Sequence, residues 1–245
     1  MARPDFRRQL DILVDRTIAV HLGSWGSFLM MVAQAPIIGC FIGLAWRGQE
    51  AVAQTYFIMS VAALWMGCMN SCTAIVSERP IFLRERMFNL NIWSYLLSKM
   101  LVLGVVCALQ TVLLLAVQGH LMHLRDSWGA HLLVFLALAW TGIAACALGL
   151  LVSAVARSAY SAVAAVPIIL IPQAIFSKVL LQGNIEKGVP SFIEKLTLTK
   201  WCYQALVDVH DGAHFLEQLK SLGALTLALA LLLALAAGAL SLAED

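Results

Sequence analysis

The stretch from Ser127 to Ala156, SWGAHLLVFLALAWTGIAACALGLLVSAVA, contains no Asp, Glu, Lys or Arg. The hydrocarbon core of a bilayer is about 30 Å thick and a helix rises about 1.5 Å per residue, so about twenty apolar residues cross it. Five other stretches, all at least that long, also lack these four residue types: 27–46, 51–76, 100–124, 158–177 and 221–243. The sequence therefore predicts an all-α membrane protein with six transmembrane helices.

The overall composition supports the membrane class. Of the 245 residues, 61% are hydrophobic and 12% are charged, and the mean hydropathy is +0.86. A soluble domain carries about twice that charged fraction. We detect no internal repeat and no low-complexity linker, so residues 1–245 are predicted to form a single transmembrane domain.

The positions of lysine and arginine predict the orientation in the membrane. The two short loops that a cytoplasmic N-terminus would place outside hold only Arg47 and Arg125. The positive-inside rule therefore predicts cytoplasmic termini in a multi-pass protein of the cell (inner) membrane. The same orientation places nine cations inside: Arg3, Arg7, Arg8, Arg16, Arg79, Arg84, Arg86, Lys99 and Arg157.

Residues 1–22 precede the first span and have the pattern of an amphipathic helix. Apolar residues recur at three- and four-residue spacing, and Arg7, Arg8, Asp11 and Asp15 fall on the opposite side. Such a helix lies in the membrane interface, with its apolar stripe in the acyl boundary. A leader that only adds solubility is the alternative.

The segment Ser77–Met87, SERPIFLRERM, separates the second and third spans. It surrounds the apolar Ile81-Phe82-Leu83 with five charged residues, and Pro80 is well tolerated in the first turn of a helix. A short cytoplasmic helix over residues 78–87 is therefore predicted. An ordinary positively charged loop would explain the arginines but not the glutamates or the exposed apolar residues, so we expect this helix to dock onto another protein.

Motifs for catalysis are missing from the sequence. It contains no Gly-x-x-x-x-Gly-Lys-Ser/Thr phosphate loop, no Gly-x-Ser-x-Gly elbow and no His-Glu-x-x-His pair. His210 and His214 have a spacing that could hold a metal, but Gly212 between them argues against a firm helix, and no metal site is predicted. The charge-free spans also disfavour an ion-coupled carrier, because such carriers usually place ionisable residues inside the membrane.

Two segments, one of them the charged segment between spans two and three, resemble a known family. Residues 78–86, ERPIFLRER, are followed by Tyr95 and Lys99, and together they resemble the Glu-Arg-x-x-Phe-x-Arg-Glu and Tyr-x-x-x-Lys signature of type-2 ABC permeases, most of all the G subfamily. Residues 200–206, KWCYQAL, are similar to a family segment in the long external loop, here 178–220, before the last span. Lys178 and Gln204 depart from the family pattern, which often has Gly and Glu there, and the loop lacks the family's paired cysteines.

The resemblance implies a permease subunit of an ATP-driven exporter rather than an enzyme. It implies no cofactor on this chain, with ATP and Mg bound by a separate nucleotide-binding ABC ATPase. The other expected partners are a second permease copy, identical or paralogous, and membrane lipid, and no nucleic acid is expected. A secondary transporter or channel and a non-transporting membrane scaffold remain alternatives. The neutral, apolar character of the expected cavity suggests a lipid, glycolipid, peptide or hydrophobic drug as substrate.

The resemblance also implies roles for individual residues. Leu180 and Leu181 would form an outer gate, or would only pack. The expected translocation cavity has two residues from the second span and two from the fifth, which also fit lipid-facing or packing positions: Met66, Asn70, Ile171 and Ala174. Coupling to the ATPase is expected from the helix between spans two and three: Glu78, Arg79, Phe82, Arg84, Glu85 and Arg86. No catalytic and no metal-binding residue is expected.

Overall fold

The computed structural model describes residues 6–48, 52–122, 128–177, 179–180, 189–212 and 215–242. Within these ranges the regular structure is entirely helical, which confirms the predicted all-α class. The elements in chain order are α1 (Phe6–Gly23), α2 (Trp25–Ala45), α3 (Ala53–Ser71), η1 (Val76–Glu78), α4 (Arg79–Arg86), α5 (Ile92–Leu121), α6 (Trp128–Val155), α7 (Ala159–Ile175), α8 (Val189–Leu196), α9 (Leu198–Asp211) and α10 (Phe215–Leu242).

Five helical segments in the described chain are long and apolar enough to cross a membrane. They are Trp25–Ala45, Ala53–Arg86, Ile92–Leu121, Trp128–Val155 and Glu217–Leu242. The helix in the remaining predicted span, α7, is apolar but has only 17 residues. The multi-pass membrane class is therefore confirmed, with five candidate spans and one shorter apolar helix.

Two helix boundaries differ from those expected from charge alone. α5 begins at Ile92 rather than near Met100, because Lys99 lies inside the helix with its charge paired. α3 ends at Ser71 rather than at Val76. The Ser153 hydroxyl of α6 accepts hydrogen bonds from the backbone amides of Ile75 (2.9 Å) and Val76 (3.0 Å), which satisfies backbone donors where the chain leaves the helix.

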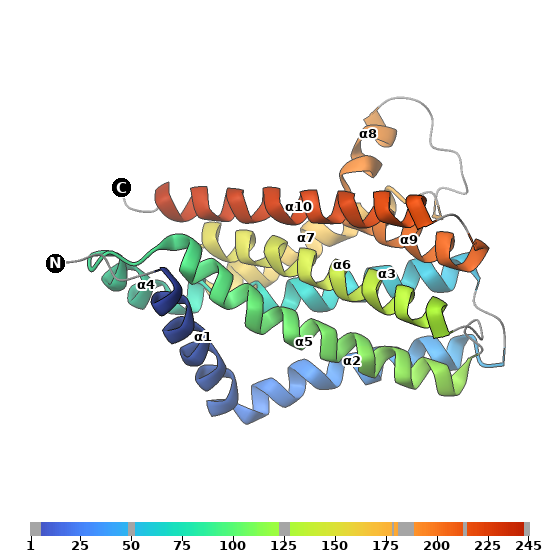
Figure 1. Ribbon diagram of the computed structural model, residues 1–245, viewed down its shortest axis with the longest axis horizontal. Helices are drawn as coiled ribbons and strands as arrows, with labels where there is room; N and C mark the ends of the chain where they lie inside the picture. Colours follow the sequence, from blue (N-terminus) through green and yellow to red (C-terminus); the bar gives the residue numbers. More distant parts are fainter. Residues whose placement is uncertain are drawn as a thin grey trace.

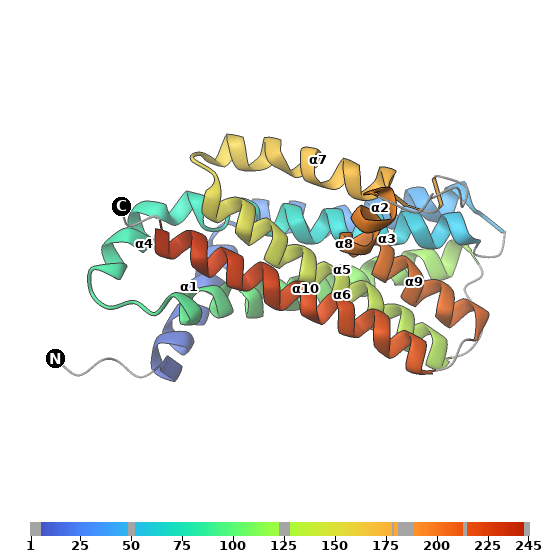
Figure 2. The same cartoon turned by 90° about the horizontal axis from the view of Figure 1, so that it is seen from above.

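The long helices α2, α3, α5, α6 and α10 run along the long axis of a bundle (Figure 1). α1 meets α2 at an angle and lies against the first part of α5, near α4 and the C-terminal end of α10. α9 lies at the opposite end. Seen from above, α7 runs along one side of the bundle, and it contacts α3, η1, α6 and α9 (Figure 2). The N-terminal helix, α4 and the last turn of α10 thus share one end of the molecule.

α6 is the centre of the bundle and packs closely on α3. Small residues allow this approach, since a Cβ added at Gly67 would meet the Gly142 carbonyl, and one added at Gly149 would meet the Ser71 hydroxyl. Small residues at a helix crossing let two backbones come near each other in a membrane. The close contacts at Gly67 of α3 and at Gly149 of α6 therefore hold these two helices together.

The segment expected as a long loop before the last span contains two helices. α9 buries Leu198, Cys202 and Leu206, which recur at four-residue spacing, and it contacts α3, α6 and α10. It ends at Asp211, and the C-cap residue Gly212 has a left-handed φ of 68°, a conformation that glycine adopts without steric cost. Gly212 thus separates His210 from His214, which lies outside the described residues.

Candidate coupling site

The short helix α4 presents two different faces. Pro80 occupies its first turn, where the missing amide hydrogen costs nothing. Phe82 is buried, 1% exposed, and its ring lies 4.9 Å from that of Tyr95 on α5, measured between centroids. Ile81 and Leu83 on the other side are 42% and 38% exposed. The helix is therefore anchored to α5 by one face and displays apolar side chains on the other.

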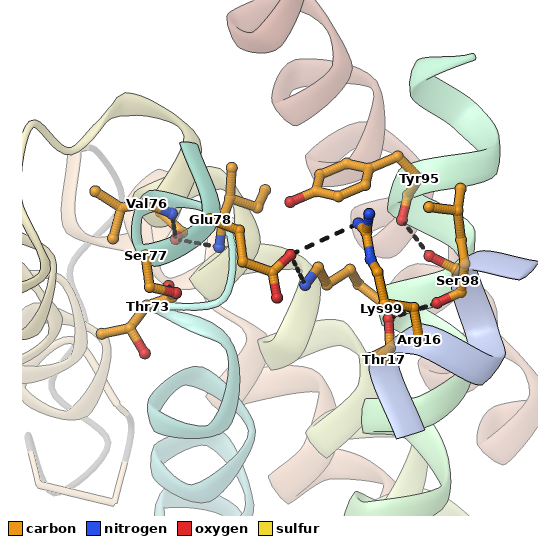
Figure 3. A network of polar contacts seen from close by, with 12 residues as sticks. Arg16, Thr17, Thr73, Val76, Ser77, Glu78, Tyr95, Ser98 and Lys99 are labelled. Atoms are coloured by element: carbon orange, nitrogen blue, oxygen red, sulfur yellow. Dashed lines mark hydrogen bonds and ion pairs between the residues drawn. The ribbon is translucent and has the colours of Figure 1, made fainter. Parts of the chain in front are cut away.

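Three ion pairs among four charged residues join α4 and the residue before it to two other helices, and Figure 3 shows the two pairs made by Glu78. Lys99 Nζ on α5 donates a hydrogen bond of 2.7 Å to Glu78 Oε2. A guanidinium nitrogen of Arg16 on α1 lies 3.8 Å from the same carboxylate oxygen. The other terminal nitrogen of Arg16 donates to Glu85 on α4. We call Arg16, Glu78, Glu85 and Lys99 the coupling network.

Lys99 is the most buried member of the coupling network, with a side chain 3% exposed. Its ammonium nitrogen lies 5.4 Å from the centre of the Tyr95 ring, within the range of a cation–π contact. Lys99 lies just before the charge-free stretch 100–124 that was predicted as the third span, and α5 extends through this lysine. The carboxylate of Glu78 offsets the cost of burying this charge.

Arg79 binds a different helix. Its two terminal nitrogens donate to the backbone carbonyls of Ala156 (2.9 Å) and Ala154 (3.0 Å), at the C-terminal end of α6. The last carbonyls of a helix have no partner within it, and a basic side chain satisfies them well. Arg79 therefore ties the start of α4 to the helix at the centre of the bundle.

The remaining residues expected to couple lie nearer the surface. Arg84 is exposed and Arg86 is half-buried. Met87 and Phe88, which follow α4 directly, are 76% and 78% exposed. Together with the exposed residues of α4 they make a mainly apolar exposed set that also includes the cation Arg84, and we call Ile81, Leu83, Arg84, Met87 and Phe88 the outer face of α4.

The side chain of Gln9 on α1 binds the backbone of the α4–α5 connection. The Gln9 side chain donates to the Asn89 carbonyl (3.3 Å) and accepts from the Asn91 amide (3.0 Å).

At the other end of α1, burial and the nearby positive charge of Lys99 lower the pKa of His21, against the raising effects of the Thr17 carbonyl and Glu78. A neutral imidazole is therefore favoured beside the coupling network.

A cleft of about 420 Å³ opens between α1, α2 and α3. His21, Asn70, Glu78 and Lys99 contribute polar groups to its wall, so the cleft reaches the coupling network. Asn70 donates to Gln110 (2.7 Å) and accepts from Gln34 (2.9 Å), an amide chain that links α2, α3 and α5. The apolar part of the wall includes Phe28, Met30, Met31 and Met69.

Comparison with known families decides the identity. The family model described as ABC-2 type transporter matches residues 8–209, which is most of the chain. The chain belongs to the ABC-2 type transporter family. No curated protein matches it. The match confirms a type-2 ABC permease, the membrane component of a transporter rather than its ATPase, and an ABC ATPase is the partner that this family implies in general. The likeness to the G subfamily stays a prediction.

The other residues expected to line the path of this ABC-2 permease are spread over the bundle. Met66 is buried, 2% exposed, in a core cluster with α9 residues such as Cys202 and Leu206. Ile171 on α7 is 53% exposed and Ala174 is half-buried. Leu180 is 55% exposed, and Leu181 lies outside the described residues. Of the four expected cavity residues, only Asn70 is on the wall of the cleft.

The sequence of this ABC-2 permease drew attention to residues of the coupling network, but it did not indicate which of them form ion pairs with each other. Tyr95 was singled out only as part of the family resemblance, Lys99 through that resemblance and as one of the cytoplasmic cations, and Arg16 only as one of those cations. One signal for Arg16 was available, because it adjoins the apolar stripe that includes Leu13 and Thr17, both buried. Pairing between positions that are 69 residues apart requires the fold.

Proposed function

We propose that this ABC-2 permease is the membrane subunit of an ATP-driven exporter. Two copies, identical or paralogous, would pair around the substrate path, and each would bind a separate nucleotide-binding subunit on its outer face of α4. ATP and Mg would be bound by that partner. This chain would supply the path, and the partner would supply the free energy that biases the path between inward- and outward-facing states.

The coupling network is the observation that carries the proposal. The outer face of α4 is suited to a protein partner because it combines exposed apolar side chains with Arg84. The inner side of the same helix is bonded through Glu85 to Arg16 on α1, and the preceding Glu78 is bonded to Lys99 on α5. A displacement of α4 would therefore act on α1 and α5 through these ion pairs, and on α2 through α1.

The orientation that fits this role has α7 as a further membrane span, the fifth of six in chain order, and both termini in the cytoplasm of an inner-membrane protein. α1, α4 and the last turn of α10 share one end of the bundle (Figure 1), and α1 and α4 together carry six arginines. The first helix of the chain would lie in the cytoplasmic interface.

The cleft beside Asn70 is the part of the substrate path that we assign to a single copy. Its wall combines amides, hydroxyls and the ion pair of Glu78 and Lys99 with methionines, which adapt to irregular apolar ligands. α7 presents exposed Ile168 and Ile171, a suitable face for the second copy. We infer an amphipathic, mainly apolar substrate such as a lipid, glycolipid, peptide or hydrophobic drug, with Leu180 and Leu181 nearer the outer exit.

One observation favours a second candidate, an ion-coupled carrier. Lys99 and Glu78 form a buried ionisable pair at the cleft wall, and such pairs occur on proton and ion pathways. Purification of the tagged protein in mild detergent, with mass spectrometry of co-purifying chains, separates the two. A stoichiometric ATPase with a phosphate-binding loop supports the exporter, whereas transport by the pure permease in vesicles without ATP supports the carrier. An ATPase that binds but gives no substrate-dependent turnover would indicate a scaffold.

A charge reversal tests coupling itself. Glu85→Arg places two arginines side by side and should abolish substrate-stimulated ATPase activity in the reconstituted complex, with the spans still folded. Combining it with Arg16→Glu restores an opposite pair and should recover part of that activity. Arg84→Glu, on the outer face, should weaken ATPase binding without rescue by Arg16→Glu. Unchanged stimulated activity in Glu85→Arg would remove the proposed role of the network.

A further inference from the structure

Two cysteine thiols meet between α5 and α6 in the interior of the bundle. The sulfur atoms of Cys107 and Cys146 lie 3.4 Å apart, and the two residues are 3% and 0% exposed. The structure describes all six cysteines of the chain, and each of them is a free thiol. Among these six, Cys107 and Cys146 form the pair whose sulfur atoms are in hydrogen-bonding contact. The proposed coupling and path do not use this pair.

The packing of α5 on α6 explains the contact. Gly142 of α6 lies opposite Cys107, because a Cβ added there would be 3.3 Å from the Cys107 Cβ and 3.5 Å from its sulfur. Cys146 lies one turn further along α6, and its thiol donates to the Gly67 carbonyl of α3 at 3.2 Å. The glycine therefore makes room for one sulfur, and the α3 backbone holds the other beside it.

The thiol pair is one side chain away from the cleft beside Asn70. Asn70 is on the wall of that cleft, and its amide nitrogen Nδ2 lies 3.8 Å from the Cys107 sulfur. On their other sides the two cysteines belong to an apolar core cluster that includes Leu103 and Ala147. In such surroundings an adduct without net charge is favoured over a charged one.

The distance between the two sulfurs selects among the atoms that two thiols can bind. A metal ion with two ligands in line would need sulfurs about 4.6 Å apart, taking about 2.3 Å for each metal–sulfur bond. A structural Zn²⁺ needs four ligands, and no group of three or more His, Cys, Asp or Glu in the described part of the chain could hold a metal. Trivalent arsenic forms three pyramidal bonds at nearly right angles. With bonds of that same length it would bridge sulfurs about 3.3 Å apart, close to the separation of Cys107 and Cys146.

We propose that Cys107 and Cys146 form a binding site for trivalent arsenicals. An organic arsenous acid, R–As(OH)₂, would react with both thiols: two As–O bonds and two S–H bonds break, two As–S bonds form, and two water molecules leave. Arsenic stays trivalent, and the product carries no charge, which suits the apolar cluster. The third bond of the arsenic would carry the organic group toward Asn70 and the cleft. Binding requires neither the ATPase nor the transported substrate of the proposed function.

Native mass spectrometry of the purified permease tests the site, with phenylarsine oxide as the probe because it hydrates to such an acid. One adduct per chain should survive washing with millimolar β-mercaptoethanol, because two linked thiols outcompete single ones, whereas the dithiol dimercaptopropanol should remove it. Cys107→Ala/Cys146→Ala should lower this retention about 100-fold, the lower end of the gain from joining two binding groups. A wild-type chain that keeps no adduct through the wash would overturn the proposal.

Cys68 and Cys72 provide the matched control. They lie four residues apart on α3 and are equally buried, at 0% and 1% exposed. The Cys72 thiol donates to the Met69 carbonyl (3.5 Å) rather than contacting another thiol. Cys68→Ala/Cys72→Ala should therefore keep the adduct. Loss of the adduct in this variant, or its retention in Cys107→Ala/Cys146→Ala, would overturn the assignment to the α5–α6 pair.

A conservative single variant separates the loss of a thiol from the loss of folding. Cys146→Ser keeps a donor for the Gly67 carbonyl, so it should fold like the wild type and lose the adduct that resists the monothiol. Phenylarsine oxide should raise the midpoint of thermal unfolding of the wild-type chain, because it binds the folded thiol pair, and should leave that of Cys146→Ser unchanged. An equal rise in both proteins would place the arsenical elsewhere and overturn the proposal.

Discussion

Lys99 Nζ lies 2.7 Å from Glu78 Oε2, a contact between a buried span residue and the residue that precedes α4. The Lys99 side chain is 3% exposed and that of Glu78 is 18% exposed. Each group is therefore largely removed from water and depends on the other. This pair places the charge of α5 next to the proposed docking helix.

Removing one member of this pair should be more damaging than removing both. Glu78→Gln leaves the Lys99 ammonium buried without its carboxylate and should lower the free energy of unfolding by about 3–5 kcal/mol. The double variant Glu78→Gln/Lys99→Met should recover much of that loss. Reversible unfolding in mixed micelles gives the double-mutant cycle, and strictly additive effects would contradict a direct pair.

Arg79 and Arg84 should differ sharply although both lie on α4. Arg79→Met removes the donors to the Ala154 and Ala156 carbonyls and should cost about 1–3 kcal/mol. Arg84→Met removes an exposed side chain and should change stability by about 0.5 kcal/mol or less. Thermal unfolding of both variants in the same detergent makes the comparison, and equal shifts would argue against the contact with α6.

The Tyr95 ring should matter more than its hydroxyl. The hydroxyl oxygen is buried and has no hydrogen-bond partner among the described residues, so Tyr95→Phe should be neutral or slightly stabilising. Phe82→Ala, which empties the space against the Tyr95 ring, should cost about 3–5 kcal/mol. A large loss in Tyr95→Phe would reveal a partner for the hydroxyl.

The α3–α6 crossing should tolerate no added methyl group at its closest point. Gly149→Ala brings a Cβ to within 2.5 Å of the Cys68 carbonyl oxygen and should cost about 1–3 kcal/mol through overpacking. Gly104→Ala is the control, because its Cβ would meet Ile143 at an ordinary 3.7 Å. Equal midpoints of thermal unfolding for the two variants would show that α3 and α6 can separate without cost.

Acidification should weaken the packing of α1 through His21. Burial lowers the pKa of His21 below its ordinary value of 6.5, so the unfolded chain binds a proton more readily than the folded one. The free energy of unfolding should therefore fall as the pH drops below 6.5 and stop falling below the folded-state pKa. His21→Gln should flatten this part of the stability profile, measured as the unfolding midpoint against pH. An unchanged slope would assign it to other groups.

The sequence was sufficient to predict the class of the protein and the approximate course of most spans. Burying an apolar helix in a bilayer depends on local composition, and a run such as Ser127–Ala156 has few other stable environments. The charged segment 78–86 also identified the family through its own residues. Local sequence was less informative about α9, which was expected within a long loop although its four-residue apolar spacing predicts a helix.

Only the tertiary structure decided how the charges are used. Lys99 was expected outside its span because an isolated ammonium is costly in a membrane, yet a carboxylate 21 residues away offsets that cost. Arg16 and Glu85 likewise meet across 69 residues, and the thiols of Cys107 and Cys146 meet across 39. The membrane environment of each helix follows from its own residues, whereas a salt bridge or a cleft between helices requires the bundle to bring its parts together.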